Sequence, residues 1–156
     1  MTKEDEIKSK LTGKFLSMEA ATRVQRQRRV FTSIEYSKFR EVMGFVLKDL
    51  GFKMLSTITG LDEGDNLSFI YHFSREDGIM LNIKTSVPKS DPRIKTITDV
   101  FPNADIYERE LVDLFGAKVE GLTEGNRYPL TDDWPKGQYP LRKDWKAPLE
   151  EEGCDA

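Results

Sequence analysis

The chain has 156 residues and a mass of 18.0 kDa, which suffices for one domain with a single core and excludes two full domains. Hydrophobic residues make up 38% and charged residues 33%, a composition typical of a folded domain with a strongly charged surface. The formal net charge is only −3, so the overall charge gives no reason to expect nucleic acid as a partner.

Cysteine usage and hydropathy indicate the compartment. The single cysteine, Cys154, builds neither a disulfide nor a metal cluster by itself, and this usage suits a reducing compartment. Residues 1–16 lack the basic-then-apolar order of a signal peptide, and no apolar run approaches the roughly 18 residues that a membrane span requires. We therefore expect a cytoplasmic chain that reaches a membrane only through a partner.

The N-terminal part of the chain predicts a helix followed by a basic strand. Ile7, Leu11 and Phe15 recur at a spacing of four, which predicts a short helix over residues 2–16. Residues 22–32 predict an edge strand with a basic side, whose arginines are Arg23, Arg26, Arg28 and Arg29. These arginines either protect the strand from edge pairing or form an interface strip.

The middle of the chain predicts a helix and then a strand. A capping box of Thr32 and Glu35 is the expected start of the helix, and Gly51 is its expected end. The run 52–59 is rich in β-branched and apolar residues, which predicts a strand that ends at Gly60.

Two further runs predict a hairpin. Residues 67–73 and 79–87 are strand-like, and residues 74–78 between them have the polar, glycine-ended composition of a hairpin loop. Alternate residues of the second run share one face, which predicts a half-buried antiparallel sheet. Residues 93–100 predict a short helix, and residues 104–115 a longer one.

Asn103 is the expected cap of that longer helix, and Gly116 is its expected stop. Beyond it, residues 118–148 show no sustained period and carry four large anchors: Tyr128, Trp134, Tyr139 and Trp145. The predicted fold is α+β, a single small domain with a mainly antiparallel sheet and packed helices. Its parts are an N-terminal helical tail (1–21), an α/β core domain (22–116) and an extended C-terminal docking segment (117–156).

The charged residues of the longer helix invite interpretation as a catalytic site. Helix geometry of about 100° per residue separates Glu108 from Glu110 by roughly 200°, so these two carboxylates cannot act as a pair. The same geometry places Arg109 one turn from both Asp105 and Asp113, and it can pair with either. These charges form either a solvated, self-paired face or a set buried under the C-terminal segment or a partner.

No other residue offers better chemistry. His72 lies in an apolar strand without the partners that a metal ligand or general base needs, so we interpret it as a core or cross-strand histidine. The sequence has no glycine-rich phosphate loop, cysteine pair, HExxH or GxSxG string. We therefore predict no catalytic, cofactor-binding or metal-binding residue in this chain.

Residues 132–145 mix tryptophan, tyrosine and proline with paired opposite charges. Proline limits the entropy of the unfolded chain, while tryptophan and tyrosine bury a large area for each side chain that becomes ordered. This composition resembles that of an interface hot spot. The alternative is a tail that wraps the domain's own sheet.

Three strings in the C-terminal third, taken together and in order, resemble the signature of a known family. They are residues 108–116 (ERELVDLFG), 126–134 (NRYPLTDDW) and 140–144 (PLRKD). They are similar to the 30-kDa subunit family of respiratory complex I. Similar subunits occur in membrane-bound, energy-converting nickel–iron hydrogenases and in sulfur-reducing complexes.

The resemblance implies a non-catalytic subunit of a membrane-bound, ion-translocating oxidoreductase complex, peripheral at the cytoplasmic face of the cell membrane. It implies docking on a large catalytic subunit and a small iron–sulfur subunit. Those partners would hold iron–sulfur clusters and, in a hydrogenase, a nickel–iron centre, whereas this chain would hold no cofactor. By motif position, the expected subunit-interface residues are Glu108, Arg109, Glu110, Asp113, Gly116, Arg127, Asp132, Trp134, Leu141, Arg142, Lys143 and Asp144.

The sequence departs from the complex I pattern at two places. Residues 121–123 (GLT) replace a Gly-His-Pro, and residues 137–139 (GQY) replace a second Gly-His. These departures favour a ferredoxin-linked hydrogenase or sulfur reductase over the 30-kDa subunit of a quinone-reducing complex I of the NADH dehydrogenase type. A free-standing protein-binding module is the alternative from another class.

Overall fold

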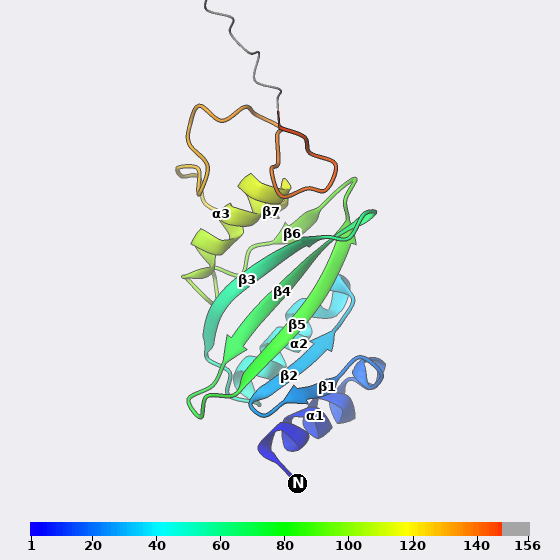
Figure 1. Cartoon of the computed structure of the whole chain (residues 1–156). Helices are drawn as coiled ribbons and strands as arrows, with labels where there is room; N and C mark the ends of the chain where they lie inside the picture. The colour runs from blue at the N-terminus through cyan, green and yellow to red at the C-terminus, as the bar shows by residue number, and fades with distance from the viewer. Residues whose placement is uncertain (148–156) are drawn as a thin grey trace, which may run out of the picture.

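The computed structural model describes residues 1–147. It contains a five-stranded sheet with three helices around it (Figure 1). The elements are α1 (Lys3–Lys14), the short 3-10 helix η1 (Leu16–Met18), β1 (Arg23–Arg26), β2 (Arg29–Ser33), α2 (Tyr36–Lys48), β3 (Met54–Asp62), β4 (Asn66–Ser74), β5 (Met80–Pro88), β6 (Arg93–Lys95), α3 (Ala104–Phe115) and β7 (Lys118–Glu120). Figure 1 shows α2 behind the sheet, α1 beside β1, and α3 at the opposite end of the molecule from α1.

The strand order in the main sheet is β1-β2-β5-β4-β3, and three of its four pairings are antiparallel. The fourth, between β2 and β5, is parallel. The α+β fold with a mainly antiparallel sheet is thereby confirmed, as is the hairpin of β4 and β5. Its alternating pattern holds as well, because the side chains that share a face with Leu81 and Ile83 on β5 are all buried.

One apolar cluster joins the helices to the sheet. Phe39 and Val42 of α2 lie against inward-facing strand residues such as Tyr71, whose ring centroid is 4.3 Å from that of Phe39. Leu11 of α1 and Met18 of η1 are fully buried in the same cluster. The N-terminal residues thus contribute to the core, while the division of the chain at residues 21 and 116 stays a prediction.

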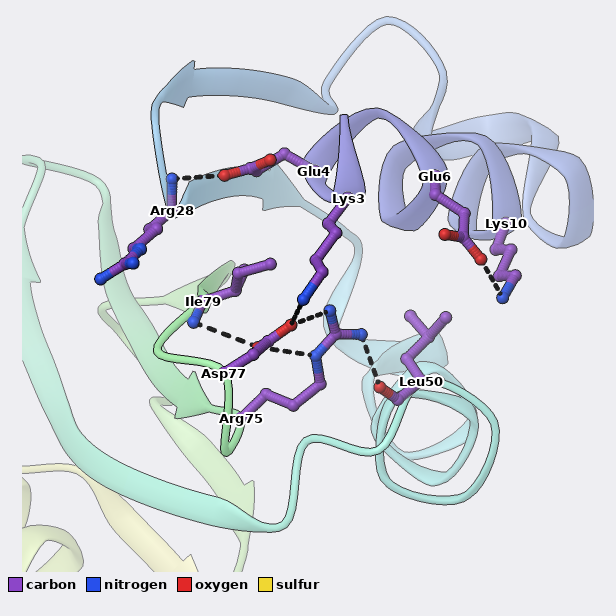
Figure 2. A network of polar contacts seen from close by, with 9 residues as sticks. All are labelled: Lys3, Glu4, Glu6, Lys10, Arg28, Leu50, Arg75, Asp77 and Ile79. Carbon is purple, nitrogen blue, oxygen red and sulfur yellow. Dashed lines mark hydrogen bonds and ion pairs between the residues drawn. The ribbon is translucent and has the colours of Figure 1, made fainter. Parts of the chain in front are cut away.

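Polar contacts hold α1 onto the loops beneath it (Figure 2). The Glu4 carboxylate accepts a hydrogen bond from the Arg28 main-chain N–H at 2.6 Å, and Lys3 pairs with Asp77 at 3.4 Å. Arg75 donates to Asp77 and also to the Leu50 carbonyl at the end of α2. This network joins α1, the β1–β2 turn, the β4–β5 loop and the end of α2.

The predicted capping box at Thr32 is wrong. Thr32 lies in β2, fully buried, with its Oγ1 2.8 Å from Thr22 Oγ1. Pairing of β2 with β5 competes successfully for this residue, and α2 begins only at Tyr36 after Glu35, which makes no side-chain cap bond. The capping box that does form joins Thr2 to Asp5 at the start of α1.

Other predicted boundaries also change. The single edge strand over residues 22–32 is a hairpin of β1 and β2, and β3 continues through Gly60 to Asp62. The helix over residues 93–100 is wrong, because residues 93–95 form β6 and pair in parallel with β7. Strand β7 (Lys118–Glu120) therefore lies within residues 118–148, which show no sustained hydrophobic period. These errors share one cause, since strand pairing depends on residues far away in sequence.

Candidate docking surface

The C-terminal segment, residues 121–147, packs against helix α3 (Figure 1). The helix ends at Gly116 in the left-handed region, at φ 70°, where glycine carries no steric penalty. Its inner side packs on β3 at Gly60, where a Cβ atom would approach Phe115 Cε2 to 2.5 Å. Asn103 does not cap the helix with its side chain, which donates instead to the Leu55 carbonyl of β3 at 2.8 Å.

Glu108 faces inward from α3 and is fully buried. Its two oxygens accept hydrogen bonds from Thr96 Oγ1 at 2.6 Å and from the Ile97 main-chain N–H at 2.8 Å. Burial raises the pKa of this carboxyl, against the opposing effect of those two hydrogen bonds. Glu108 therefore fixes the chain before α3, while Glu110 is half-buried.

Arg109 pairs toward the start of the helix. Its Nε and Nη2 atoms each lie 2.9 Å from a different oxygen of Asp105, and this bidentate contact lowers the pKa of Asp105. Nη2 also donates to the Thr123 carbonyl at 2.8 Å, so the pair holds the beginning of the C-terminal segment. Each of the two interpretations left open for these charges describes part of the helix. Arg109 is self-paired with Asp105, whose side chain is 40% exposed, while the C-terminal segment contacts Arg109 and Asp113.

Asp113 binds the next part of the C-terminal segment. Its carboxylate accepts hydrogen bonds from Arg127 Nε and from the Leu130 main-chain N–H, each at 3.2 Å. Arg127 in turn donates to the Trp134 carbonyl at 2.9 Å. One buried carboxylate on α3 therefore orders the chain from residue 127 to residue 134.

The PLRKD string (residues 140–144) contacts the end of α3. Arg142 Nε donates to the Phe115 carbonyl at 2.6 Å, and the Leu141 N–H donates to the Leu114 carbonyl at 3.1 Å. The ring of Tyr139 lies on Gly116, where a Cβ atom would come within 2.5 Å of it. These contacts satisfy carbonyl groups that the helix end leaves without partners.

Asp62 and Lys89 hold the same string from the sheet side. Asp62 is buried and accepts from Lys89 Nζ at 2.7 Å and from the Lys143 main-chain N–H at 2.8 Å. Burial alone would raise the pKa of Asp62, but hydrogen bonds from Lys89, Gly64 and Lys143 lower it to about 2. Lys89 also pairs with Asp144 at 2.8 Å, and both carboxylates raise its pKa.

The two tryptophans form a small cluster within the segment. The ring centroids of Trp134 and Trp145 are 5.9 Å apart. Their indole N–H groups donate to the Gln138 carbonyl and to Gln138 Oε1, each at 3.0 Å. Gln138 occupies the position of a histidine in the complex I pattern. Its main-chain carbonyl accepts from Trp134, and its side-chain oxygen accepts from Trp145.

The outward side of this region carries the groups that face solvent. Asp132 and Lys143 are exposed, and three apolar side chains are among the most exposed in the chain. They are Leu141 at 52%, Tyr128 at 43% and Ile106 at 43%. The expected interface residues therefore divide into an inward set that fastens the segment to α3 and an outward set that is open to a partner. Their contact with another chain stays a prediction.

Three residues that no sequence pattern indicates also contribute to this surface: Asp62, Lys89 and Thr96. The only local signal was the Asp62-Glu63-Gly64 turn, in which Asp62 also accepts from the Gly64 N–H at 2.9 Å. The partners of these residues lie far away in sequence, up to 81 residues for Asp62 and Lys143.

Titratable groups elsewhere are also engaged in structural contacts. His72 is a cross-strand histidine, with Nδ1 2.6 Å from Asn82 Oδ1 and Nε2 2.9 Å from Thr59 Oγ1. Within residues 1–147, no three His, Cys, Asp or Glu side chains gather as metal ligands would. Cys154 lies outside the described residues. None of the helices in that same range combines the length and apolar character needed to cross a bilayer.

Comparison with known proteins points to one family. The family described as "Respiratory-chain NADH dehydrogenase, 30 Kd subunit" matches residues 32–151. The chain is 30% identical over 157 residues to the membrane-bound hydrogenase subunit beta of Pyrococcus furiosus, covering 97% of this chain and 91% of that one. It is 31% identical over 140 residues to a subunit of the F(420)H(2) dehydrogenase of Methanosarcina mazei, covering 88% of each.

A solved structure agrees with these matches. The chain superposes with a TM-score of 0.81 on a chain from the structure of the membrane-bound sulfane sulfur reductase, described as an archaeal respiratory membrane complex. The two are 29% identical, and the match covers 93% of this chain and 86% of the other.

Proposed function

We propose that this chain is a non-catalytic assembly subunit of a membrane-bound, ion-translocating oxidoreductase. The basis is that the chain belongs to the family of the 30-kDa subunit of respiratory-chain NADH dehydrogenase. The complex would be of the ferredoxin-linked hydrogenase or sulfur-reductase type, and this subunit would lie peripherally at its cytoplasmic face. Relatives named as subunits of a hydrogenase and of a sulfane sulfur reductase complex support this type.

The observation that carries the proposal is the division of the C-terminal segment into two sides. Three arginines hold the segment on α3. Arg109 of α3 donates to the Thr123 carbonyl, while Arg127 and Arg142 of the segment donate to Asp113 and to the Phe115 carbonyl. The outward side keeps apolar groups such as Leu141 in solvent. A surface that is ordered in advance loses less entropy on binding, which suits a docking role.

The partners that we propose for this surface are the large catalytic subunit and the small iron–sulfur subunit. Electron transfer would take place through cofactors in those chains. A non-catalytic role fits the use that this chain makes of its acids and its histidine. Glu108, Asp113 and His72 are all engaged in hydrogen bonds that hold elements of the fold together.

The test is co-purification of the tagged full-length chain from its native membranes. We expect the wild type to bring down the two partner subunits, identified by mass spectrometry. Leu141→Glu replaces the most exposed of the three apolar side chains on the outward side with a charged one and should reduce their recovery about tenfold. The melting temperature of the isolated chain should not change, because Leu141 is 52% exposed.

Met54→Glu is the matched control. Met54 is 62% exposed and lies at the end of β3 away from Asp62, so the same chemical change should leave recovery intact. Equal recovery of partners by wild type and Leu141→Glu would place the interface elsewhere. A wild-type chain that purifies from membranes alone would favour a free-standing binding module.

A further inference from the structure

The arginines of this chain fall into two groups. Of ten arginines, five have carboxylate partners within the chain, for example Arg40 with Asp99 and Arg93 with Asp91. Arg142 donates to a main-chain carbonyl instead. The remaining four have no ion-pair partner among residues 1–147. We call them the arginine cluster: Arg23, Arg26, Arg28 and Arg29, at the β1–β2 hairpin.

The register of the hairpin brings like charges together. Arg26 and Arg29 are direct partners across the two strands. Like charges in that position destabilise a sheet. Among residues 1–147, neither arginine forms an ion pair with a carboxylate. The isolated chain therefore carries an electrostatic cost that an acidic partner would remove.

Arg28 gives a second, independent indication. Its φ is 61°, and it is the one residue other than glycine with a positive φ among residues 1–147. The left-handed region is unfavourable for a side chain with a Cβ atom, so glycine or asparagine would suit this turn better. Glu4 stabilises the turn by accepting from the Arg28 N–H. The fold thus keeps an arginine where the backbone favours another residue.

The side chains surround a hollow. An open cavity of about 480 Å³ is lined by Arg26, Gln27, Arg28, Arg29 and Gly78. Figure 2 shows the Arg28 side chain extending away from the Glu4 carboxylate that holds its main-chain N–H. Nη1 of Arg28 lies 3.7 Å from the position of a Cβ atom on Gly78, so the guanidinium covers that glycine. Arg23 stacks on the Phe31 ring nearby, 4.9 Å from its centroid.

We infer that the arginine cluster is a second docking surface, which binds an acidic polypeptide segment of a partner chain. Guanidinium groups bind carboxylates with two parallel hydrogen bonds, and three of them around one hollow suit separate acidic side chains. A lipid surface fits less well. A broad anionic membrane would also approach the acidic first turn of α1, which packs beside the hairpin, whereas a single peptide can enter the hollow between the arginines. The hairpin lies at the end of the molecule opposite the C-terminal segment (Figure 1), so this surface is separate from the one proposed above.

The test measures binding of a fluorescein-labelled peptide of alternating glutamate and serine to the full-length chain by fluorescence anisotropy. Arg28→Gly is the main variant, because glycine removes the guanidinium and relieves the backbone strain together. We expect binding to weaken about tenfold while the melting temperature stays equal to the wild-type value or rises. Arg26→Gln should weaken binding by a similar factor.

Arg93→Gln is the matched control, because that exposed arginine already has Asp91 as its partner, and we expect its affinity for the peptide to equal that of the wild type. Two further probes separate the sources of binding. A glutamine–serine peptide should not bind, and vesicles of phosphatidylcholine and phosphatidylserine should bind less tightly than the glutamate peptide. Unchanged affinity in both Arg28→Gly and Arg26→Gln would overturn the proposal, as would preferential binding of the vesicles.

Discussion

The central sheet and the C-terminal segment reach an ordered state by different means. Strands β3, β4 and β5 are held by continuous main-chain pairing over a buried apolar layer. The segment over residues 121–147 has no strand or helix, and charged side chains that bond to main-chain groups hold it in place. Its order thus depends on a few ionised groups rather than on a ladder, and single substitutions or a change of pH should affect it selectively.

The two tryptophans make this comparison measurable. Trp134 and Trp145 are the only tryptophans in the chain, and both lie in the segment. Fluorescence excited at a wavelength selective for tryptophan therefore reports on the segment, whereas far-ultraviolet circular dichroism reports mainly on the sheet and helices. A difference between these two signals separates the unfolding of the segment from that of the sheet.

Gly116→Ala should have the largest effect. A Cβ atom there meets the Tyr139 ring, and the left-handed backbone adds strain, so we expect a loss of about 2–3 kcal/mol in the stability of the seated segment. Urea titration followed by tryptophan fluorescence measures it. Gly137→Ala is the control, because Gly137 has a positive φ and no atom within 4 Å of its Cβ position. Equal losses in the two variants would mean that backbone strain, and not the contact with Tyr139, accounts for the effect.

Arg142→Ala should cost roughly 1.5 kcal/mol, because it removes a charged donor from the Phe115 carbonyl. The tryptophan transition should move to lower urea concentration, and the circular dichroism transition should move less. Lys136→Ala, an exposed change in the same segment, should stay within about 0.5 kcal/mol of the wild type. An identical shift of both transitions in Arg142→Ala would show that segment and sheet unfold as one unit.

Acid should release the segment without any substitution. The folded pKa of Asp62 is about 2, below the unfolded value of about 3.9. Its contribution is therefore complete above about pH 4 and is lost as the pH falls through about 2. Tryptophan fluorescence should change across that window in the wild type and much less in Asp62→Asn. Superimposable acid titrations of the two proteins would contradict the assignment.

The fold follows from the sequence where the pattern is local. Helix α3 and the β4–β5 hairpin are predicted almost to their ends, because apolar spacing and glycine stops lie within each element. Local patterns give wrong predictions at two places. Residues 32–35 predict a helix start, but Thr32 belongs to β2, which pairs with β5. Residues 93–100 predict a helix, but residues 93–95 form β6, which pairs with β7.

The candidate surface follows the same rule. Motif positions indicate Arg109, Asp113 and Arg142, but not which groups they contact. Asp62 and Lys89 hold Lys143 and Asp144 across long sequence separations, and no local spacing encodes such a contact. These contacts depend on the fold, because the sheet brings the end of β3 and the end of β5 close to α3.

Amide hydrogen exchange of the isolated full-length chain tests most directly whether the C-terminal segment is seated on α3 before any partner arrives. If it is, the amides of Leu130, Leu141 and Lys143, which donate to Asp113, the Leu114 carbonyl and Asp62, should exchange slowly. We expect rates at least about tenfold below those of an unfolded chain. Exchange of these three amides at unfolded-chain rates, with β4 and β5 still protected, would contradict a segment that is ordered in advance.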